Sequence, residues 1–443
     1  MAQRKLDLLL RGGECVLPSG VVRCDVGILE GRIALLGEGD ETEAQSVIDA
    51  RGLTILPGVM DVQVHFREPG LEHKEDLHTG TLAAVMGGVT AVFEMPNTTP
   101  PTTSMAALHD KLRRAHGRVY CDIAFFVGAT AGNIQELAAL EQEPGCCGVK
   151  VFMGSSTGTL LVPDDETLRQ VFLHGKRRVA LHAEDESRLI ARKSIAEKAG
   201  RVQSHPEWRD AECARLATAR AVALAKETGR PIHVLHVTTE EEIPLLAKEK
   251  PLVTFEVPPQ HLTFAAPECY DRLGTLAQMN PPIREERHRK ALWAAIEKGW
   301  VDVIATDHAP HTLEEKAQPY PKSPSGMPGV QTLVPVMLNH VHEGRLSLQQ
   351  MVELLCAGPA RIYGIKDRGR LEVGALGSLT VVDLNARRTI TNDWIKSRVG
   401  WTPFAGMEVV GWPVATIVRG NVVMLRDQLV GEPLGEPVAF ENK

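Results

Sequence analysis

Between Val59 and Asp307, short apolar runs alternate with segments of helical periodicity. The runs are typical of buried strands and read VMDVQVHF, VTAVFEM, VYCDIAFFV, GVKVF, RRVALHAE, PIHVLHV, LVTFEV and VDVIATD. Helical patterns separate several of them, including EDLHTGTLAAVMGG, SMAALHDKLRRAHG and Asp210 to Glu227. Strands alternating with helices over about 300 residues predict a parallel (β/α)8 barrel, with an open doubly wound sheet as the alternative.

The two ends of the chain have a different texture. Residues 1–56 show short apolar runs broken by Gly and Ser, and residues 366–443 return to that style in GRLEVGALGSLTVVDLN and MEVVGWPVATIVRGNVVML. We expect both ends to pair into a small β-sandwich domain that flanks a barrel domain of residues 57–365. The final segment, GEPLGEPVAFENK, is expected to be loosely ordered.

Composition narrows the class of protein. The chain has 443 residues, 43% of them hydrophobic, and a formal net charge of -7. This balance lacks the basic surface that binding to nucleic acid requires. Charges interrupt the apolar stretch of MAQRKLDLLLRGGECV, and no run approaches about 18 apolar residues, so neither secretion nor membrane insertion is expected. The eight cysteines lack CxxC spacing, which favours reduced core thiols and a cytoplasmic protein.

Single polar residues stand at the ends of five of the strand-like runs. They are His65, Lys150, His182, His236 and Asp307. Because the carboxyl ends of parallel barrel strands meet at one mouth, these side chains are expected to converge on a site suited to metal chemistry.

The first of these runs carries the densest polar pattern. In DVQVHFRE, Asp61, Gln63, His65 and Arg67 alternate with apolar residues, so a period of two places all four on one face. In a barrel that face points inward. Burying four polar groups is costly unless a metal or a polar ligand satisfies them.

Lys150 lies in the apolar run GVKVF, where loss of hydration lowers the pKa of an amine. Two interpretations are open. A neutral amine can react with carbon dioxide to give a carbamate, an oxygen ligand able to bridge two metals. Alternatively, the lysine pairs with a buried carboxylate.

His182 and His236 each close a β-rich run, and imidazole is the commonest zinc ligand. His233 falls on the opposite face and is interpreted as structural. In DVIATDHAPH, Asp307 follows an apolar strand, where its carboxylate can bind a metal and accept a proton from water.

A family resemblance covers most of the chain. In order, DVQVHFREPG, MPNTTP, GVKVFMGSSTG, LHAE, HVT, QMNPPIR, TDHAPH and PSGMPGV resemble motifs of the dihydroorotases within the amidohydrolase superfamily. The resemblance implies a (β/α)8 barrel with two zinc ions. It also implies reversible cyclisation of N-carbamoyl-L-aspartate to L-dihydroorotate, a step of pyrimidine biosynthesis.

The resemblance also implies roles for individual residues. His65 and Asp307 would bind one zinc, His182 and His236 the other, and carboxylated Lys150 would bridge them. Asp307 would be the general base and, once protonated, the acid for the departing amide nitrogen. The implied substrate-binding residues are Arg67, Asn97 and His311 for the carboxylate and Asn280 for the pyrimidine ring. Residues 310–329 would form a mobile loop near the substrate.

This chain departs from the family pattern at Gln63, Gln260 and Gln331, where relatives carry His, His and often Glu. An amide oxygen is a weaker zinc donor than imidazole. Gln63 therefore coordinates weakly, or hydrogen-bonds beside a single tight zinc, or marks a non-catalytic subunit that associates with aspartate carbamoyltransferase. A related cyclic amidase (dihydropyrimidinase, hydantoinase or allantoinase) is the other alternative, against which Arg67 argues. A homodimer acting on a small molecule is expected.

Overall fold

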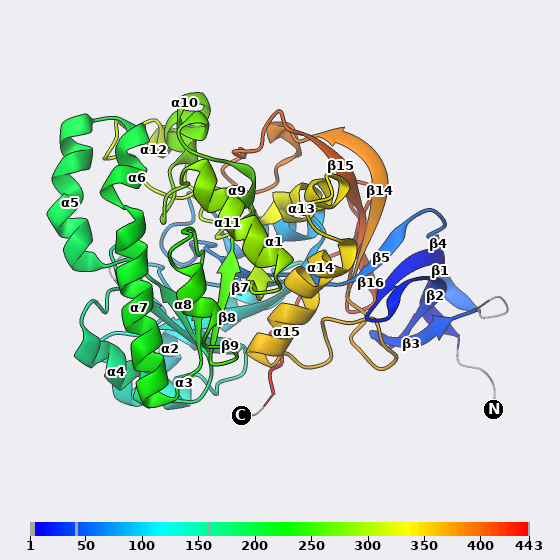
Figure 1. Ribbon diagram of the computed structural model, residues 1–443. Helices are drawn as coiled ribbons and strands as arrows, with labels where there is room; N and C mark the ends of the chain where they lie inside the picture. The colour runs from blue at the N-terminus through cyan, green and yellow to red at the C-terminus, as the bar shows by residue number, and fades with distance from the viewer. Residues whose placement is uncertain (1–4, 40–42, 157–159, 442–443) are drawn as a thin grey trace.

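The computed structural model describes residues 5–39, 43–156 and 160–441. Within them, an eight-stranded parallel sheet and a nine-stranded mixed sheet organise the chain (Figure 1). Thr157 and Gly158 of the GVKVFMGSSTG motif lie outside the described residues, as do the outermost residues of the two predicted end segments.

The parallel sheet is a barrel whose strands follow one another in chain order. Its strands are β6 (Val59–Val64), β7 (Val89–Glu94), β8 (Asp122–Gly128), β9 (Cys146–Phe152), β10 (Val179–His182), β11 (Ile232–Val234), β12 (Val253–Val257) and β13 (Val303–Ile304). The backbone N–H of His65 donates to the carbonyl of His308 at 2.7 Å, which joins the segment after β13 to the end of β6. The predicted (β/α)8 barrel is thereby confirmed, and the open sheet is wrong.

Helices cover the outside of the barrel (Figure 1). They are α1 (Leu77–Met86), α2 (Met105–Ala115), α3 (Leu137–Leu140), α4 (Asp165–Leu173), α5 (Glu186–Ala199), α6 (His205–Trp208), α7 (Ala211–Thr228), α8 (Ile243–Ala247), α9 (Pro259–Thr263), α10 (Glu268–Leu273), α11 (Glu286–Glu297), α12 (Leu313–Lys316), α13 (Leu333–His342), α14 (Leu348–Val352) and α15 (Gly358–Tyr363). Side-chain oxygens cap several helix starts, as Asp76 does for α1 and Asp210 for α7.

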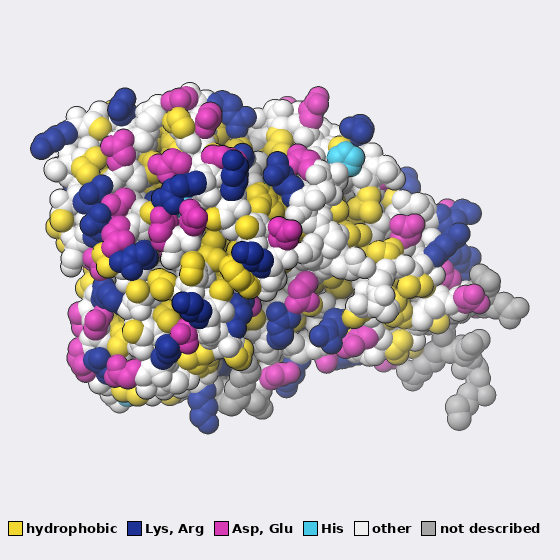
Figure 2. All heavy atoms as spheres, viewed as in Figure 1, with side chains coloured by type: hydrophobic (Ala, Val, Ile, Leu, Met, Phe, Trp, Pro, Cys, Tyr) yellow, Lys and Arg dark blue, Asp and Glu magenta, His cyan; other side chains and the backbone are white. Residues whose placement is uncertain are grey.

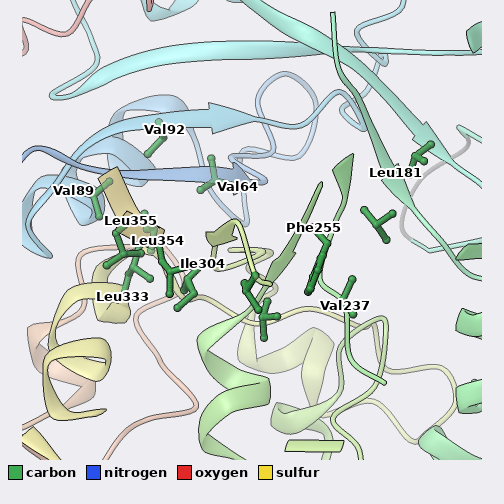
Figure 3. Packing of buried hydrophobic residues seen from close by; sticks show 14 of the residues in the cluster. Val64, Val89, Val92, Leu181, Val237, Phe255, Ile304, Leu333, Leu354 and Leu355 are labelled. Atoms are coloured by element: carbon green, nitrogen blue, oxygen red, sulfur yellow. The ribbon is translucent and has the colours of Figure 1, made fainter. Parts of the chain in front are cut away.

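The main apolar core lies between the strands and these helices. Figure 3 shows Val89 and Ile304 from the strand side close to Leu333, Leu354 and Leu355 from the helical layer, all buried. Burial of both faces explains why the barrel strands read as nearly continuous apolar runs. The polar strand ends are the exceptions, and they form the site.

The C-terminal segment covers the end of the barrel at which strand β8 begins, opposite the cavity described below. The N–H of Ile123 donates to Glu436 O and that of Val438 to Ile123 O, both at 3.0 Å. Phe440 then packs on Phe93, with ring centroids 5.7 Å apart. The expectation of a loosely ordered tail is wrong for this segment, because it covers aromatic side chains that would otherwise face water.

The mixed sheet contains strands from both ends of the chain. They are β1 (Leu6–Leu17), β2 (Gly20–Leu29), β3 (Arg32–Gly37), β4 (Ala44–Asp49), β5 (Thr54–Pro57), β14 (Leu379–Thr389), β15 (Glu408–Val418), β16 (Asn421–Leu425) and β17 (Gln428–Leu429). β5 pairs antiparallel with β14, which joins the two ends in one sheet around its own apolar core, as expected. The domain boundaries at 56/57 and 365/366 stay predictions.

The surface and the thiols agree with the composition. On the face shown in Figure 2, Lys and Arg side chains are interspersed with Asp and Glu. Seven of the eight cysteines are buried and Cys24 is half-buried, and each is a free thiol. Across the described ranges, no helix has the length and apolar character needed to cross a membrane.

Candidate active site

A cavity lies at the carboxyl ends of the barrel strands. It is lined by Gln63, His65, Arg67, Asn97, Lys150, Phe152, Ser156, His182, His236, Asn280, Asp307, Ala309, Ser325 and Gly326. All of the predicted metal ligands are therefore brought together, along with three of the predicted substrate-binding residues. His311 does not line the cavity and lies behind its wall.

His65 and Asp307 form one pair of donors, with Nε2 and Oδ1 3.0 Å apart. His65 Nδ1 lies 2.7 Å from Asn97 Oδ1, an acceptor, so Nδ1 carries the proton and Nε2 presents a lone pair. Burial lowers the pKa of His65, which favours the neutral imidazole that metals bind. The Gln63 amide donates to Asp307 Oδ1 at 3.0 Å.

His182 and His236 form the second pair, with Nδ1 and Nε2 3.0 Å apart. Two nitrogens bound to one tetrahedral zinc at about 2.0–2.1 Å lie roughly 3.3 Å from each other, so this spacing suits a shared cation. His182 Nε2 donates to Glu184 at 2.9 Å, and Arg209 pairs with Glu184 behind it. Burial lowers the pKa of both histidines.

Lys150 lies near both pairs. Its side chain is buried, and its Nζ has no hydrogen-bond partner among the described residues. The nearest feature is the Phe152 ring, whose centroid is 4.3 Å from Nζ. Burial lowers the pKa of Lys150 to about 7, and the negative charges of Asp307 and Glu256 oppose that shift. The structure therefore supports an available amine rather than a lysine paired with a carboxylate.

The donors fit a metal only as a composite site. No group of three or more His, Cys, Asp or Glu side chains in the described part of the chain could hold a metal by itself. Among the residues that the structure describes, three buried polar atoms of the site have no partner: Lys150 Nζ, His236 Nδ1 and Gln63 Oε1. Unpartnered polar groups in a cavity are costly, so their presence here points to a polar occupant such as a metal completed by Lys150.

Backbone strain concentrates at the strand ends that carry the site. Arg67, His236 and Asp307 have φ values of 66°, 39° and 48°, in the left-handed region that disfavours residues with a Cβ. Such conformations cost about 1–3 kcal/mol each and persist where the surroundings fix them. They turn these three side chains toward the cavity.

The prediction that Asp61 faces the cavity together with Gln63, His65 and Arg67 is wrong for Asp61. Asp61 does not line the cavity, because its carboxylate accepts from the Thr306 N–H at 3.0 Å and from the Thr306 hydroxyl. The pairing register between β6 and β7 shifts between Asp61 and Val64, which breaks the strict period of two. Gln63, His65 and Arg67 reach the cavity as predicted.

Arg67 lines the cavity and is only 1% exposed. It forms no ion pair with any residue that the structure describes, and its Nε donates to Pro310 O at 3.3 Å. Burial lowers the pKa of Arg67 to about 10. A buried guanidinium without a carboxylate partner is a binding site for an anionic group.

His311 supports Arg67 from behind. Lys74 Nζ lies 3.2 Å from His311 Nδ1, while His311 Nε2 lies 3.0 Å from Ser325 O and 3.3 Å from Arg67 Nη2. Burial lowers the pKa of His311 to about 3, which keeps the ring neutral. Lys74 was missed in the sequence because it follows no strand and belongs to no periodic pattern.

Asn280 is held by a second buried histidine. His205 Nε2 donates to Asn280 Oδ1 at 3.0 Å, and Tyr320 OH lies 3.1 Å from His205 Nδ1. Burial lowers the pKa of His205 to about 3. Because its oxygen is occupied, Asn280 offers its N–H groups to the cavity, which suits a carbonyl acceptor. His205 gave no sequence signal, since its partners come from distant segments.

The remaining polar positions lie outside the cavity. Gln260 donates to Thr306 O at 2.9 Å, and Gln331 bonds to the backbone of Trp394 and Lys396 at 2.7 Å. His233 bonds to Glu256 and Thr254, in agreement with its structural interpretation.

Known proteins resemble this chain along nearly its whole length. Residues 54–423 match the family model described as Amidohydrolase family. The dihydroorotase of Methanosarcina mazei is 35% identical over 96% of this chain and 96% of its own, and that of Pyrococcus furiosus is 34% identical over 97% and 96%. An L-hydantoinase (dihydropyrimidinase) from Arthrobacter aurescens superimposes with a TM-score of 0.93 at 30% identity, over 98% of this chain and 99% of that chain.

Proposed function

Because this chain belongs to the amidohydrolase family and is a cyclic amide hydrolase, we propose that it is a dihydroorotase, which interconverts N-carbamoyl-L-aspartate and L-dihydroorotate in pyrimidine biosynthesis. The curated relatives carry that name, whereas a similar solved structure is a hydantoinase. The choice between these substrates depends on the cavity residues that lie on loops rather than at strand ends.

Arg67 is the observation that carries the proposal. The dihydroorotate ring bears a carboxylate, and a bidentate guanidinium fits that group. Hydantoin, dihydrouracil and allantoin lack a ring carboxylate, so they would leave Arg67 buried and uncompensated, which disfavours their binding. Arg67 thus supports dihydroorotase over the related amidases.

Family membership implies a metal cofactor, and imidazole and carboxylate donors suit zinc. We propose that His65 and Asp307 would hold one ion and His182 and His236 the other, and that Lys150, as a carbamate, would serve as the oxygen ligand for both. Bound there, zinc would supply Lewis-acid polarisation of water and of the ring carbonyl at neutral pH.

The protein's own residues position the substrate and move the proton. Arg67 anchors the ring carboxylate, Asn97 lies beside it, and the Asn280 amide donates to a ring carbonyl. Asp307 accepts a proton from the attacking water and returns it to the ring nitrogen as the amide bond breaks. Cyclisation runs these proton transfers in reverse.

Gln63, which stands where the family pattern has a histidine, donates a hydrogen bond to Asp307. In the arrangement described, its amide nitrogen donates to Asp307 Oδ1, so its oxygen faces away from that carboxylate. We propose that Gln63 orients Asp307 as a hydrogen-bond donor, and that the first metal is held with fewer strong ligands than the second.

A substrate panel tests the proposal. The purified protein should open L-dihydroorotate and leave hydantoin, dihydrouracil and allantoin largely unchanged. Ring closure consumes a proton, so cyclisation should be favoured at acidic pH and hydrolysis at alkaline pH. Turnover of hydantoin in preference to dihydroorotate would transfer the assignment to the hydantoinases. Protein with neither zinc nor turnover would indicate the non-catalytic subunit of an aspartate carbamoyltransferase.

The cellular setting belongs to the same proposal. A cytoplasmic homodimer, free or associated with aspartate carbamoyltransferase, is consistent with a biosynthetic enzyme that acts on a small molecule. Light scattering of the purified protein, alone and with the carbamoyltransferase, measures this.

A further inference from the structure

Lys316, the last residue of α12, has an unusual environment for a lysine. Its side chain is fully buried, and its Nζ donates to three backbone carbonyls: Gln278 O at 3.0 Å, Pro324 O at 2.8 Å and Gly326 O at 2.9 Å. An ammonium has three N–H donors, so these carbonyls use its whole capacity.

Within the described ranges, Lys316 forms no ion pair with a carboxylate, and burial lowers its pKa to about 7. A cation surrounded only by carbonyl oxygens resembles a bound monovalent ion in a coordination cage. Here the cation is tethered to the chain by its own side-chain stem.

The three carbonyls belong to two segments that meet at the cavity. Gln278 also bonds to the second segment through its side chain, which donates to Ser323 O at 2.9 Å and accepts from the Ser323 hydroxyl at 2.6 Å. The N–H of Gly326 donates to Gln278 O at 2.9 Å. Ser325 and Gly326 line the cavity on one segment, as does Asn280 on the other.

We propose that Lys316 is a positioning residue of the substrate site, whose ammonium acts as a built-in cation that fixes residues 323–326 against Gln278 and so shapes the wall that holds the substrate ring. The identity of that ring rests on the proposed function, whereas the connection between the two segments does not. The mobility expected for residues 310–329 is restrained at this point.

Removing the ammonium acts on one half of the site. The carbonyls of Pro324 and Gly326 lose this donor, and that of Gln278 keeps only the Gly326 N–H, so residues 323–326 should loosen toward water, because unpaired buried carbonyls are unfavourable. Asp307 and the metal-facing histidines stand on strand ends that Lys316 does not touch. Loss of binding shared by the ground state and the transition state raises KM and leaves kcat nearly unchanged.

Lys316→Met is the direct test, because it keeps an apolar stem and removes the donors. We expect KM to rise roughly tenfold or more with kcat within about threefold of wild type. Amide hydrogen exchange should accelerate in residues 323–327 and stay unchanged in β9 and β10. Lys198→Met is the matched control, since Lys198 is an exposed lysine in the last turn of α5.

Hydrogen exchange separates this proposal from the proposed function. If wild type opens another cyclic amide instead of dihydroorotate, the functional assignment fails, and the same KM comparison is made with that amide. Unchanged exchange in residues 323–327 of Lys316→Met overturns the role of Lys316 whatever the substrate. A fall in kcat with unchanged KM overturns it as well.

Chemical rescue covers the case in which Lys316→Met folds poorly. Lys316→Ala leaves space along the missing stem, so added propylammonium should raise the melting temperature and lower KM toward wild type. Propanol has the same shape without three N–H donors and should do neither. Equal rescue by both compounds would assign Lys316 a packing role and overturn the proposal.

Discussion

The two halves of the cavity are built differently. The strand half, which we propose binds metal, consists of side chains at strand ends: His65, Lys150, His182, His236 and Asp307. The hydrogen bonds between the barrel strands fix these positions. The loop half, which we propose holds the substrate, consists of Arg67, Asn97, Asn280, Ser325 and Gly326. Most of these residues lie on loops. Single buried lysine and histidine side chains connect these loops by hydrogen bonds.

This difference assigns separate tasks to the two halves. An L-hydantoinase shares this fold at a TM-score of 0.93, and its name refers to a ring other than the one we propose here, so a barrel frame alone does not identify a substrate. Buried lysine and histidine side chains, namely Lys316, His205 and Lys74, set the shape of the loop half. Changes in the strand half should lower kcat, and changes in the loop half should raise KM or alter substrate choice.

Asp307→Asn probes the strand half most severely. The amide keeps the shape of the carboxylate but can no longer accept a proton, so we expect kcat for dihydroorotate to fall roughly 10⁴-fold with KM changed little. Steady-state kinetics beside a thermal melt measures this. Kinetics dominated by KM would contradict the division of tasks.

Lys150→Ala tests the bridging role in the same half. Activity should fall roughly 10³-fold together with zinc content, because the site loses the ligand shared by both donor pairs. Added propionate should restore part of both by supplying the missing carboxylate. A variant that retains its zinc and ignores propionate would show that Lys150 acts as an amine.

Arg67→Met tests the loop half. The loss of a charge-assisted hydrogen bond to the ring carboxylate should lower kcat/KM for dihydroorotate roughly 100-fold. Hydantoin lacks that carboxylate, so its turnover should stay the same or rise. An equal loss on both rings would show that Arg67 supports the site as a whole rather than selecting the substrate.

The strand half was the more predictable from sequence, for a physical reason. A strand ending in one polar residue leaves a local pattern, and barrel topology brings such ends together. The position of Asp61 was predicted wrongly because a register shift breaks the period of two. The proposed carboxylation of Lys150 and the proposed metals cannot be read from spacing, because they depend on burial and on small molecules.

The loop half left fewer local traces. The period of two also placed Arg67, but its role and that of Asn280 came from motif resemblance, whereas Lys74, His205 and Lys316 were missed. Their partners are backbone carbonyls and side chains distant in sequence, such as the Pro324 O that Lys316 binds. Periodicity does not encode contacts of that kind. The C-terminal segment that closes the barrel was missed for the same reason.

Gln63→His tests how tightly the strand half binds its first metal. A second imidazole should tighten the first metal site by roughly tenfold, so less added zinc would be needed for full activity. At saturating zinc the rate should change only a few-fold, since Asp307 remains. Titration of zinc-depleted protein measures both. Unchanged zinc demand would show that Gln63 does not weaken the first site.

His311→Gln has the smallest expected effect on activity and appears as pH dependence of stability. Burial lowers the pKa of His311 to about 3 in the folded protein, against an ordinary value of 6.5. The unfolded chain therefore binds the extra proton first as the pH falls. The stability that the neutral ring contributes is complete above about pH 6.5 and decreases by about 2 kcal/mol toward pH 5.

A glutamine can donate to Ser325 O and accept from Lys74, yet it does not titrate. The free energy of unfolding of His311→Gln, measured in urea at both pH values, should therefore decline less with acid than that of wild type. The variant at exposed His116, His116→Gln, is the matched control and should keep the wild-type slope. Comparing slopes removes any loss common to both pH values, so a wild-type slope in His311→Gln would mean that His311 is not held neutral behind the substrate wall.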